Sequence, residues 1–355
     1  MKRYVALCEG GFDEEAKTAT GVLRYAESPT VAVIDSTRAG THVGDHVPGL
    51  ASDVPVVATL ADALAFEPTT MLVGIAPAGG KLPEAFKAMV LEAIAAGLDV
   101  ESGLHDFLGD DPRLAAAAAA AGVELRDLRR PPAGLNVPTG ENLTIPAHVV
   151  LTVGSDCALG KMTVCLELHR EARRRGLASE FVATGQTGIA IAGWGIAVDE
   201  VVSDYVAGAA ERLVVEGHRR GGDDAILWIE GQGSINHPFY SGVTLGLLHG
   251  SAPRSLLIVH EPGRALIDGD PRYPIPPLAG LIEDYRRIAA YVRPAPMAGV
   301  ALKTNRLSEA EARAAIDEIA AATGLVTDDP VRFGAGRLLD AVLAGRAAVI
   351  DQPSR

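Results

Sequence analysis

The chain has 355 residues, of which 48% are hydrophobic and 22% charged, so it is long enough for two folded domains. Its net charge of -13 argues against nucleic acid and against an anionic membrane surface as partners. Three cysteines are too few for a disulfide framework, and no apolar run is long enough to cross a membrane. The first residues lack the apolar core of a signal peptide, so we expect a cytoplasmic protein.

The first part of the chain alternates short β-branched segments with helical patterns. We predict strands at residues 4–7, 30–34, 54–57 and 70–75, and helices at residues 83–96 and 111–121. Alternating strands and helices are typical of a parallel, doubly wound sheet. The sequence therefore predicts an α/β fold, with a Rossmann-like parallel-sheet domain over residues 1–130.

A proline-rich linker follows at residues 131–147, and a second α/β domain occupies residues 148–355. We predict its strands at residues 149–153, 180–184, 225–229, 255–260 and 297–302, and its helices at residues 164–175, 200–216, 278–292 and 308–323. Ser308 and Glu311 have the spacing of a capping box, which makes the start of the last helix the best defined.

The segment from Gly154 to Thr163 follows a predicted strand and leads into a predicted helix. That order of elements is typical of a phosphate-binding loop, because glycines let backbone amides close around an anion and the helix N-terminus favours negative charge. Lys161 adds a positive charge. Met162 stands where a serine or threonine hydroxyl normally holds Mg²⁺. The loop therefore indicates polyphosphate binding more firmly than ATP hydrolysis, within a phosphate-loop NTPase-like α/β domain.

Two residues of this loop have alternative roles. Asp156 either helps to hold Mg²⁺ or accepts hydrogen bonds from loop amides, and the sequence leaves both open. Cys157 lies near a helix N-terminus, where thiolate is favoured, which would suit a nucleophile. No histidine is adjacent to it in the sequence, so a purely structural role in the loop is the alternative.

Polar residues also follow the next strands of the second domain. Glu230 ends a predicted strand and precedes a Gly-Gln-Gly segment, and residues 184–188 form a glycine-flanked polar turn. Ligands of open α/β sheets bind at these strand ends. His260 ends another strand, and Arg264 follows it in a loop where arginine is able to hold a carboxylate.

The loop and the Glu230 strand end resemble dethiobiotin synthetase and related phosphate-loop ligases, a resemblance that covers the second half only. A closer resemblance spans nearly the whole chain. It rests on residues 17–25, 35–37, 102–105, 154–163, 184–188 and 230–234, which are similar to the D-glutamate N-acetyltransferase family, a prokaryotic family long recorded as of unknown function.

The second resemblance implies transfer of an acetyl group from acetyl-CoA to the amino group of D-glutamate or a similar amino acid. The phosphate loop would hold the CoA diphosphate, with these residues: Gly154, Ser155, Asp156, Cys157, Gly160, Lys161, Met162 and Thr163. We expect the catalytic groups to be Glu230, His260 and Gln186, and the substrate-binding groups to be Arg264, Arg38, Lys17, Thr184 and Gln232.

Two other functions remain open at this stage. One is an ATP- and Mg²⁺-dependent ligase or kinase that activates a carboxylate, with Glu230 and Asp156 as the metal ligands. The other is a nucleotide-binding regulatory protein. For the acetyltransferase we expect no bound metal, a small amino acid as the partner, neither nucleic acid nor membrane, and a homo-oligomer.

Overall fold

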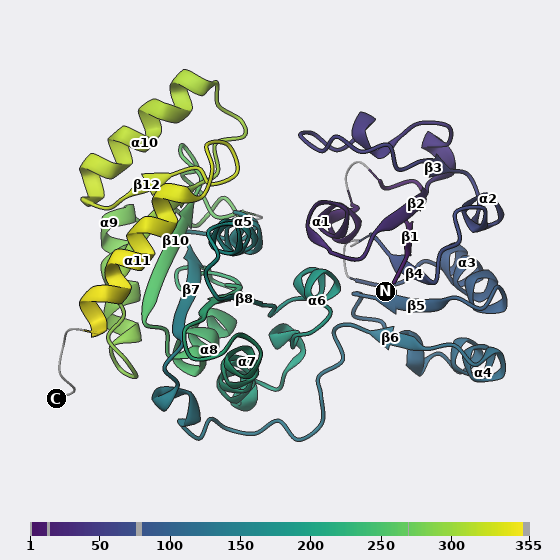
Figure 1. The fold of residues 1–355 in the computed structure, drawn as a ribbon, viewed down its shortest axis with the longest axis horizontal. Coiled ribbons are helices and arrows are strands. Elements are labelled where there is room, and N and C mark those ends of the chain that lie inside the picture. The colour runs from purple at the N-terminus through teal and green to yellow at the C-terminus, as the bar shows by residue number, and fades with distance from the viewer. Residues whose placement is uncertain (1, 13–14, 76–79, 269, 351–355) are drawn as a thin grey trace. The chain divides into compact units, whose positions relative to one another are not determined.

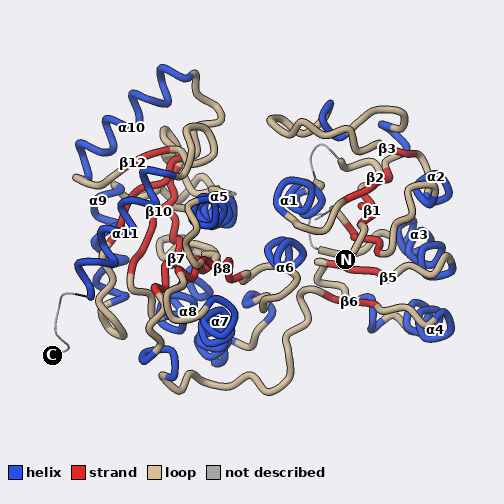
Figure 2. The backbone as a smooth tube through the Cα atoms, viewed as in Figure 1, coloured by secondary structure: helices blue, strands red, loops and turns tan. Residues whose placement is uncertain are grey.

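The computed structural model describes residues 2–12, 15–75, 80–268 and 270–350, which form two compact α/β units (Figure 1). Unit 1 contains Met1–Pro131 and Gly185–Glu200, and unit 2 contains Pro132–Thr184 and Val201–Arg355. Each unit is built on a parallel six-stranded sheet, which Figure 2 shows in red. The predicted pair of parallel-sheet domains is therefore confirmed. No helix in the described part of the chain combines the length and apolarity that a membrane span requires.

Unit 1 has the strand order β3-β2-β1-β4-β5-β6. Its strands are β1 Tyr4–Leu7, β2 Thr30–Ile34, β3 Val56–Val57, β4 Thr70–Val73, β5 Asp99–Ser102 and β6 Leu125–Asp127. Its helices are α1 Lys17–Tyr25, α2 Leu60–Leu64, α3 Glu84–Ala95, α4 Pro112–Ala121 and α6 Gln186–Ala192. Helices α1 and α6 cover one face of the sheet and α2, α3 and α4 the other (Figure 1). This is the doubly wound order of a Rossmann-like domain.

Unit 2 has the strand order β12-β11-β10-β7-β9-β8. Its strands are β7 His148–Gly154, β8 Ser179–Val182, β9 Ile226–Ile229, β10 Ser255–His260, β11 Met297–Leu302 and β12 Thr327–Asp328. Its helices are α5 Lys161–Arg174, α7 Val206–Gly221, α8 Ser241–Ser251, α9 Leu278–Ala289, α10 Glu309–Thr323 and α11 Gly336–Ile350. Strands β7 and β9 are buried along their whole length, and β10 is buried up to the half-buried His260, so their carboxyl ends are held at one edge of the sheet.

Most predicted elements are present, and the capping box of α10 is confirmed, since Ser308 and Glu311 bond each other's backbone amides. Two predictions were wrong, one at each end of residues 185–200, the segment of unit 1 that interrupts the chain of unit 2. The segment 184–188 is not a turn: α6 begins at Gln186, and its apolar side packs against α1 within unit 1. The helix predicted from Glu200 begins instead at Val206, because short 3₁₀ turns carry the chain back into unit 2.

Helix α8 is missing from the sequence prediction because its glycines lower helix propensity. In the structure, these glycines allow close packing of α8 against α7. A Cβ at Gly246 would lie 2.4 Å from a Val206 methyl carbon, and one at Gly250 would lie 2.1 Å from the Ala207 carbonyl oxygen. Tertiary contact thus outweighs propensity in this helix.

His148, at the start of β7, makes unit 2 sensitive to acid. Burial, with Arg346 and Arg254 nearby, lowers the pKa of His148 to about 4. The His148 imidazole of the unfolded chain therefore binds a proton below about pH 6.5, whereas that of the folded protein stays neutral until about pH 4. The free energy of unfolding consequently decreases as the pH falls from 6.5 toward 4. We expect a loss of up to about 3 kcal/mol over that range, since one pKa unit corresponds to about 1.4 kcal/mol.

The measurement is urea unfolding of the wild type, of His148→Gln and of the control His249→Gln between about pH 7 and pH 4.5. His249 lies on α8, where its ring contacts the Ile288 carbonyl. The pH slope should flatten only in the His148 variant. Equal slopes in all three proteins would show that another group causes the acid sensitivity.

Candidate phosphate-loop site

The phosphate loop joins β7 to α5 in unit 2, as the sequence predicts. The backbone of Gly160 has φ of 91°, a left-handed conformation that favours glycine, and α5 begins at the next residue. Lys161 is buried, and its Nζ donates to the Asp156 carbonyl oxygen at 2.8 Å. The lysine charge and the positive end of a 14-residue helix therefore face the same loop.

Two glycines let the backbone approach this loop closely. A Cβ at Gly154 would lie 2.9 Å from the Asp156 carbonyl oxygen and 3.0 Å from Lys161 Nζ. A Cβ at Gly231, which follows Glu230 after β9, would lie 1.7 Å from the Thr152 carbonyl oxygen. Both positions exclude any side chain, which explains the glycines that the sequence pattern singled out.

Asp156 is fully buried and acts as the organising acid of the loop. One carboxylate oxygen accepts from the Cys157 amide at 2.6 Å. The other accepts from Arg264 Nη1 at 2.9 Å and from the Asp268 amide at 2.8 Å. These bonds agree with one of the two roles that the sequence left open, in which Asp156 accepts hydrogen bonds from backbone amides. Arg264 is already held by Asp156 and by Glu261, so it orders the loop.

Glu230, Thr184 and Gln232 form a hydrogen-bonded cluster at the ends of β8 and β9. The Thr184 amide donates to Glu230 Oε2 at 2.9 Å, and its hydroxyl donates to the Glu230 carbonyl at 2.7 Å. Gln232 Nε2 in turn donates to the Thr184 carbonyl and, at 3.3 Å, to its hydroxyl. Glu230 is only 7% exposed, so its carboxylate is fixed by the backbone rather than by solvent.

His260 is joined to the loop by a hydrogen bond of 2.8 Å between its Nδ1 and the Ser155 hydroxyl. Burial lowers the pKa of His260, Arg264 lowers it further, and Glu261 partly opposes this shift. The ring is therefore neutral at neutral pH, the state that a general base requires.

Sequence reasoning missed two residues that brace this loop, Tyr285 and Asn236. The Tyr285 hydroxyl donates to the Gly154 carbonyl at 2.8 Å and accepts from the Ile235 amide at 3.1 Å. Asn236 Nδ2 donates to the Ser155 carbonyl at 3.1 Å. Tyr285 has no sequence signal beyond its place on the apolar face of α9, whereas Asn236 lies just after the glycine-flanked Glu230 motif.

Three candidate residues belong to unit 1 instead. Gln186 starts α6, where its side chain lies against Gly103: a Cβ there would be 2.6 Å from Gln186 Cγ. Lys17 is exposed at the start of α1, and Arg38 bonds the Thr37 hydroxyl in a 3₁₀ turn. The predicted site residues of unit 2 therefore lie at the loop and at the neighbouring strand ends. Gln186, Lys17 and Arg38 belong to unit 1.

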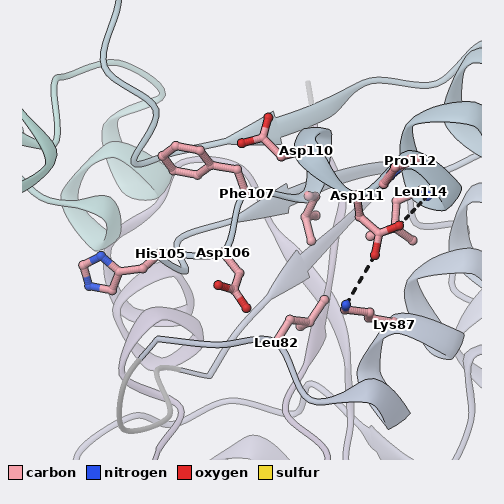
Figure 3. A pocket seen from close by; sticks show the side chains of 10 residues that line it. Leu82, Lys87, His105, Asp106, Phe107, Asp110, Asp111, Pro112 and Leu114 are labelled. Atoms are coloured by element: carbon pink, nitrogen blue, oxygen red, sulfur yellow. Dashed lines mark hydrogen bonds and ion pairs between the residues drawn. The ribbon is translucent and has the colours of Figure 1, made fainter.

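Unit 1 has a pocket of its own, of about 470 Å³, which Figure 3 shows from close by. Three of its lining residues are acidic, Asp106, Asp110 and Asp111, and Lys87 forms an ion pair with Asp111 at 3.3 Å. This balance of charge suits a polyphosphate poorly.

Asp156, Cys157 and His237 each place one potential metal-binding atom within 4.8 Å of the others. The backbone amide of Phe239, however, donates to His237 Nδ1 at 3.2 Å. An acceptor Nδ1 places the proton of the neutral ring on Nε2, and a protonated nitrogen does not ligate a metal. Nε2 is the nitrogen that faces Asp156, at 3.9 Å from Oδ1. His237 therefore presents an N–H donor to Asp156, and this protonated nitrogen does not suit a metal ligand.

Comparison with known proteins identifies the family. Residues 36–131 match the profile of DUF1611_N, described as a Rossmann-like domain, and residues 136–339 match that of DUF1611, described as a P-loop domain. The chain belongs to the DUF1611 family. A crystal structure of a DUF1611 family protein from Anabaena variabilis ATCC 29413 superposes with a TM-score of 0.91 at 41% identity, over 97% of this chain and 100% of that one.

Two curated proteins that are similar to the present chain carry the name D-glutamate N-acetyltransferase. The one from Tritonibacter scottomollicae is 37% identical over 330 residues, which is 93% of this chain and 94% of the relative. The one from Pseudoalteromonas sp. is 34% identical over 266 residues, or 75% of this chain and 78% of the relative.

Substitution of Gly231 tests the close approach that builds the site. Gly231→Ala should destabilise the protein by about 1–3 kcal/mol, because the methyl group forces the backbone away from Thr152. Gly242→Ala is the control, since a Cβ on this exposed helical glycine meets nothing within 4 Å. It should stabilise the protein by up to about 1 kcal/mol in the same thermal melts. Equal effects of the two variants would refute the packing argument.

Proposed function

We propose that the protein is an N-acetyltransferase that moves the acetyl group of acetyl-CoA to the amino group of D-glutamate or a closely similar amino acid. The observation that carries this proposal is a phosphate loop, with a left-handed Gly160 and a buried Lys161 at the start of α5, in which Met162 stands in place of the metal-binding hydroxyl. The names of the two curated relatives support the same reaction.

The loop suits a ligand that is held by its phosphates and reacts elsewhere. CoA carries a diphosphate, which the loop amides, Lys161 and the N-terminus of α5 would bind. The carboxylate of Asp156 is occupied by Arg264 and two backbone amides, which disfavours its use as a Mg²⁺ ligand. Both features favour acetyl-CoA over Mg²⁺-ATP.

The acceptor amine needs a base, since only the neutral amine is nucleophilic. His260 is the group best suited to remove its proton, because burial keeps the imidazole neutral. Its hydrogen bond to Ser155 ties the base to the loop that would hold the donor. Glu230 has a different role in this scheme: it fixes Thr184 and Gln232, which would orient the amino acid.

A paired turnover assay tests the proposal. One arm supplies acetyl-CoA and D-glutamate and measures free thiol, and the other supplies ATP, Mg²⁺ and D-glutamate and measures ADP. We expect thiol release that requires D-glutamate. Lys161→Ala should raise KM for acetyl-CoA about 10- to 100-fold, because a charge-assisted hydrogen bond contributes about 1.5–3 kcal/mol.

Lys87→Ala is the matched control, a lysine that pairs with acids beside the unit 1 pocket. Its KM for acetyl-CoA should equal that of the wild type, and a rise in this variant alone would place the donor in unit 1. ADP formation without thiol release would contradict the acetyltransferase and favour a ligase or kinase.

A further inference from the structure

We propose that Cys157 is the nucleophile of the reaction, so that the acetyl group passes through a thioester on this residue before the amine accepts it. The inference rests on the proposed function, which by itself requires only direct transfer. It begins from the cluster of Asp156, Cys157 and His237, which the fold assembles at the phosphate loop from residues about eighty positions apart.

The first observation is a buried donor beside the thiol. A ring nitrogen of His237, a carboxylate oxygen of Asp156 and the Cys157 Sγ lie within 4.8 Å of one another. His237 is 1% exposed, and its Nε2 has no hydrogen-bond partner among the described residues. A buried polar atom without a partner is costly, so one that persists beside a thiol points to a function in which it gains an acceptor.

The second observation is the direction of that donor. Because the Phe239 amide occupies Nδ1, the neutral ring carries its proton on Nε2. An N–H is the group that stabilises a sulfur anion, or the oxyanion that forms when the sulfur attacks a carbonyl. His237 is also fixed by ring contacts with Phe239 and Tyr240, whose centroids lie 5.7 and 4.7 Å away, so its donor is preorganised.

The third observation concerns the charges around Cys157. Asp156 alone would oppose a thiolate, but its carboxylate is paired with Arg264 at 2.9 Å. Arg264 Nη1 also donates to the Cys157 carbonyl at 3.1 Å, and Lys161 donates to the Asp156 carbonyl. The N-terminus of α5, which favours negative charge, begins four residues after Cys157, so positive groups lie on more than one side of this loop residue.

The other two cysteines lack these features. Cys8 and Cys165 are fully buried, and burial raises the pKa of both thiols well above the usual range. Cys157, by contrast, is half-buried within the loop. The chain therefore offers one thiol in a reactive position and two that serve as internal controls.

The transfer balances in two steps. Because Cys157 lies among the amides that would hold the diphosphate, the pantetheine arm of acetyl-CoA has to fold back over the loop to bring the acetyl group to this residue. The Cys157 sulfur, its proton lost to solvent, then attacks the carbonyl carbon of acetyl-CoA; a carbon–sulfur bond forms to Cys157, and the bond to the CoA sulfur breaks. CoA leaves as a thiolate and takes a proton from solvent. The amine nitrogen then attacks the acetyl carbon, the bond to Cys157 breaks, and the amine proton passes to His260. One thioester replaces another in the first step, so no further energy source is needed.

Mass spectrometry of the whole protein tests this directly. The wild type is mixed with acetyl-CoA without any amino acid, quenched in acid and weighed, and a digest then locates the modification. We expect one acetyl group per chain, on the peptide that contains Cys157 and not on those with Cys8 or Cys165. D-glutamate added before the quench should remove it. An unmodified wild type, quenched over a range of times, would overturn the inference.

Kinetics separate this inference from the proposed function. The wild type should give parallel double-reciprocal lines for the two substrates, and Cys157→Ala should lose at least about 100-fold in kcat while it still binds CoA. His237→Ala should lower kcat about 10- to 100-fold with little change in KM, and His237→Gln, which keeps an N–H, should recover part of the loss. His249→Ala is the matched control with wild-type kcat.

Each other result has a definite meaning. A folded Cys157→Ala protein with wild-type kcat, or intersecting lines for the wild type, would refute the covalent step and leave a directly transferring acetyltransferase. A wild type that releases no thiol with D-glutamate or related amino acids would refute the proposed function itself.

Discussion

The buried carboxylate of Asp156 is the group on which the candidate site depends. It is fully removed from solvent, yet it accepts hydrogen bonds from Arg264 and from two backbone amides. A buried charge is tolerated only when it is paired and hydrogen-bonded in this way, so the loop has one conformation in which all of these contacts form together. The same backbone segment presents its carbonyl to Lys161 and its neighbour Cys157 to His237. The segment of Asp156 thus positions both Lys161, the cation of the proposed phosphate site, and Cys157, the proposed nucleophile.

In the proposed function, the loop binds the phosphates of its ligand and does not cleave them. Glycine at 154 and 231 gives the close backbone approach that any phosphate loop needs, and the helix dipole and Lys161 supply the charge. The parts that usually drive hydrolysis are altered, because Met162 offers no hydroxyl and Asp156 is occupied by protein donors. A loop of this kind is suited to holding a large substrate by its phosphate handle, while the chemistry takes place at residues beyond it. In the proposed scheme, the pantetheine arm folds back so that the acetyl group reaches Cys157 in the loop and His260, which is bonded to Ser155.

Much of the fold could be predicted from the sequence, because strand and helix periodicities are local. The strands at 4–7, 30–34, 255–260 and 297–302 have the predicted bounds, and the phosphate loop follows from its strand-turn-helix context. Failures occurred where tertiary contacts decide. Helix α8 depends on glycines that pack against α7, and residues 185–200 join unit 1 although both neighbouring segments belong to unit 2.

The site could be predicted only in part, because tertiary contacts also decide which of its residues meet. His237 meets Cys157 across eighty positions of sequence, and Tyr285 reaches Gly154 from another helix, so neither pairing leaves a pattern in the linear chain.

The central claim is that the phosphate loop of unit 2 holds the diphosphate of CoA. A crystal structure of the protein with CoA bound measures this most directly. The account predicts that the two phosphates lie within hydrogen-bond distance of the backbone amides between Ser155 and Met162, with Lys161 Nζ moved from the Asp156 carbonyl to a phosphate oxygen. Phosphates bound anywhere else, in the unit 1 pocket for example, would contradict the account.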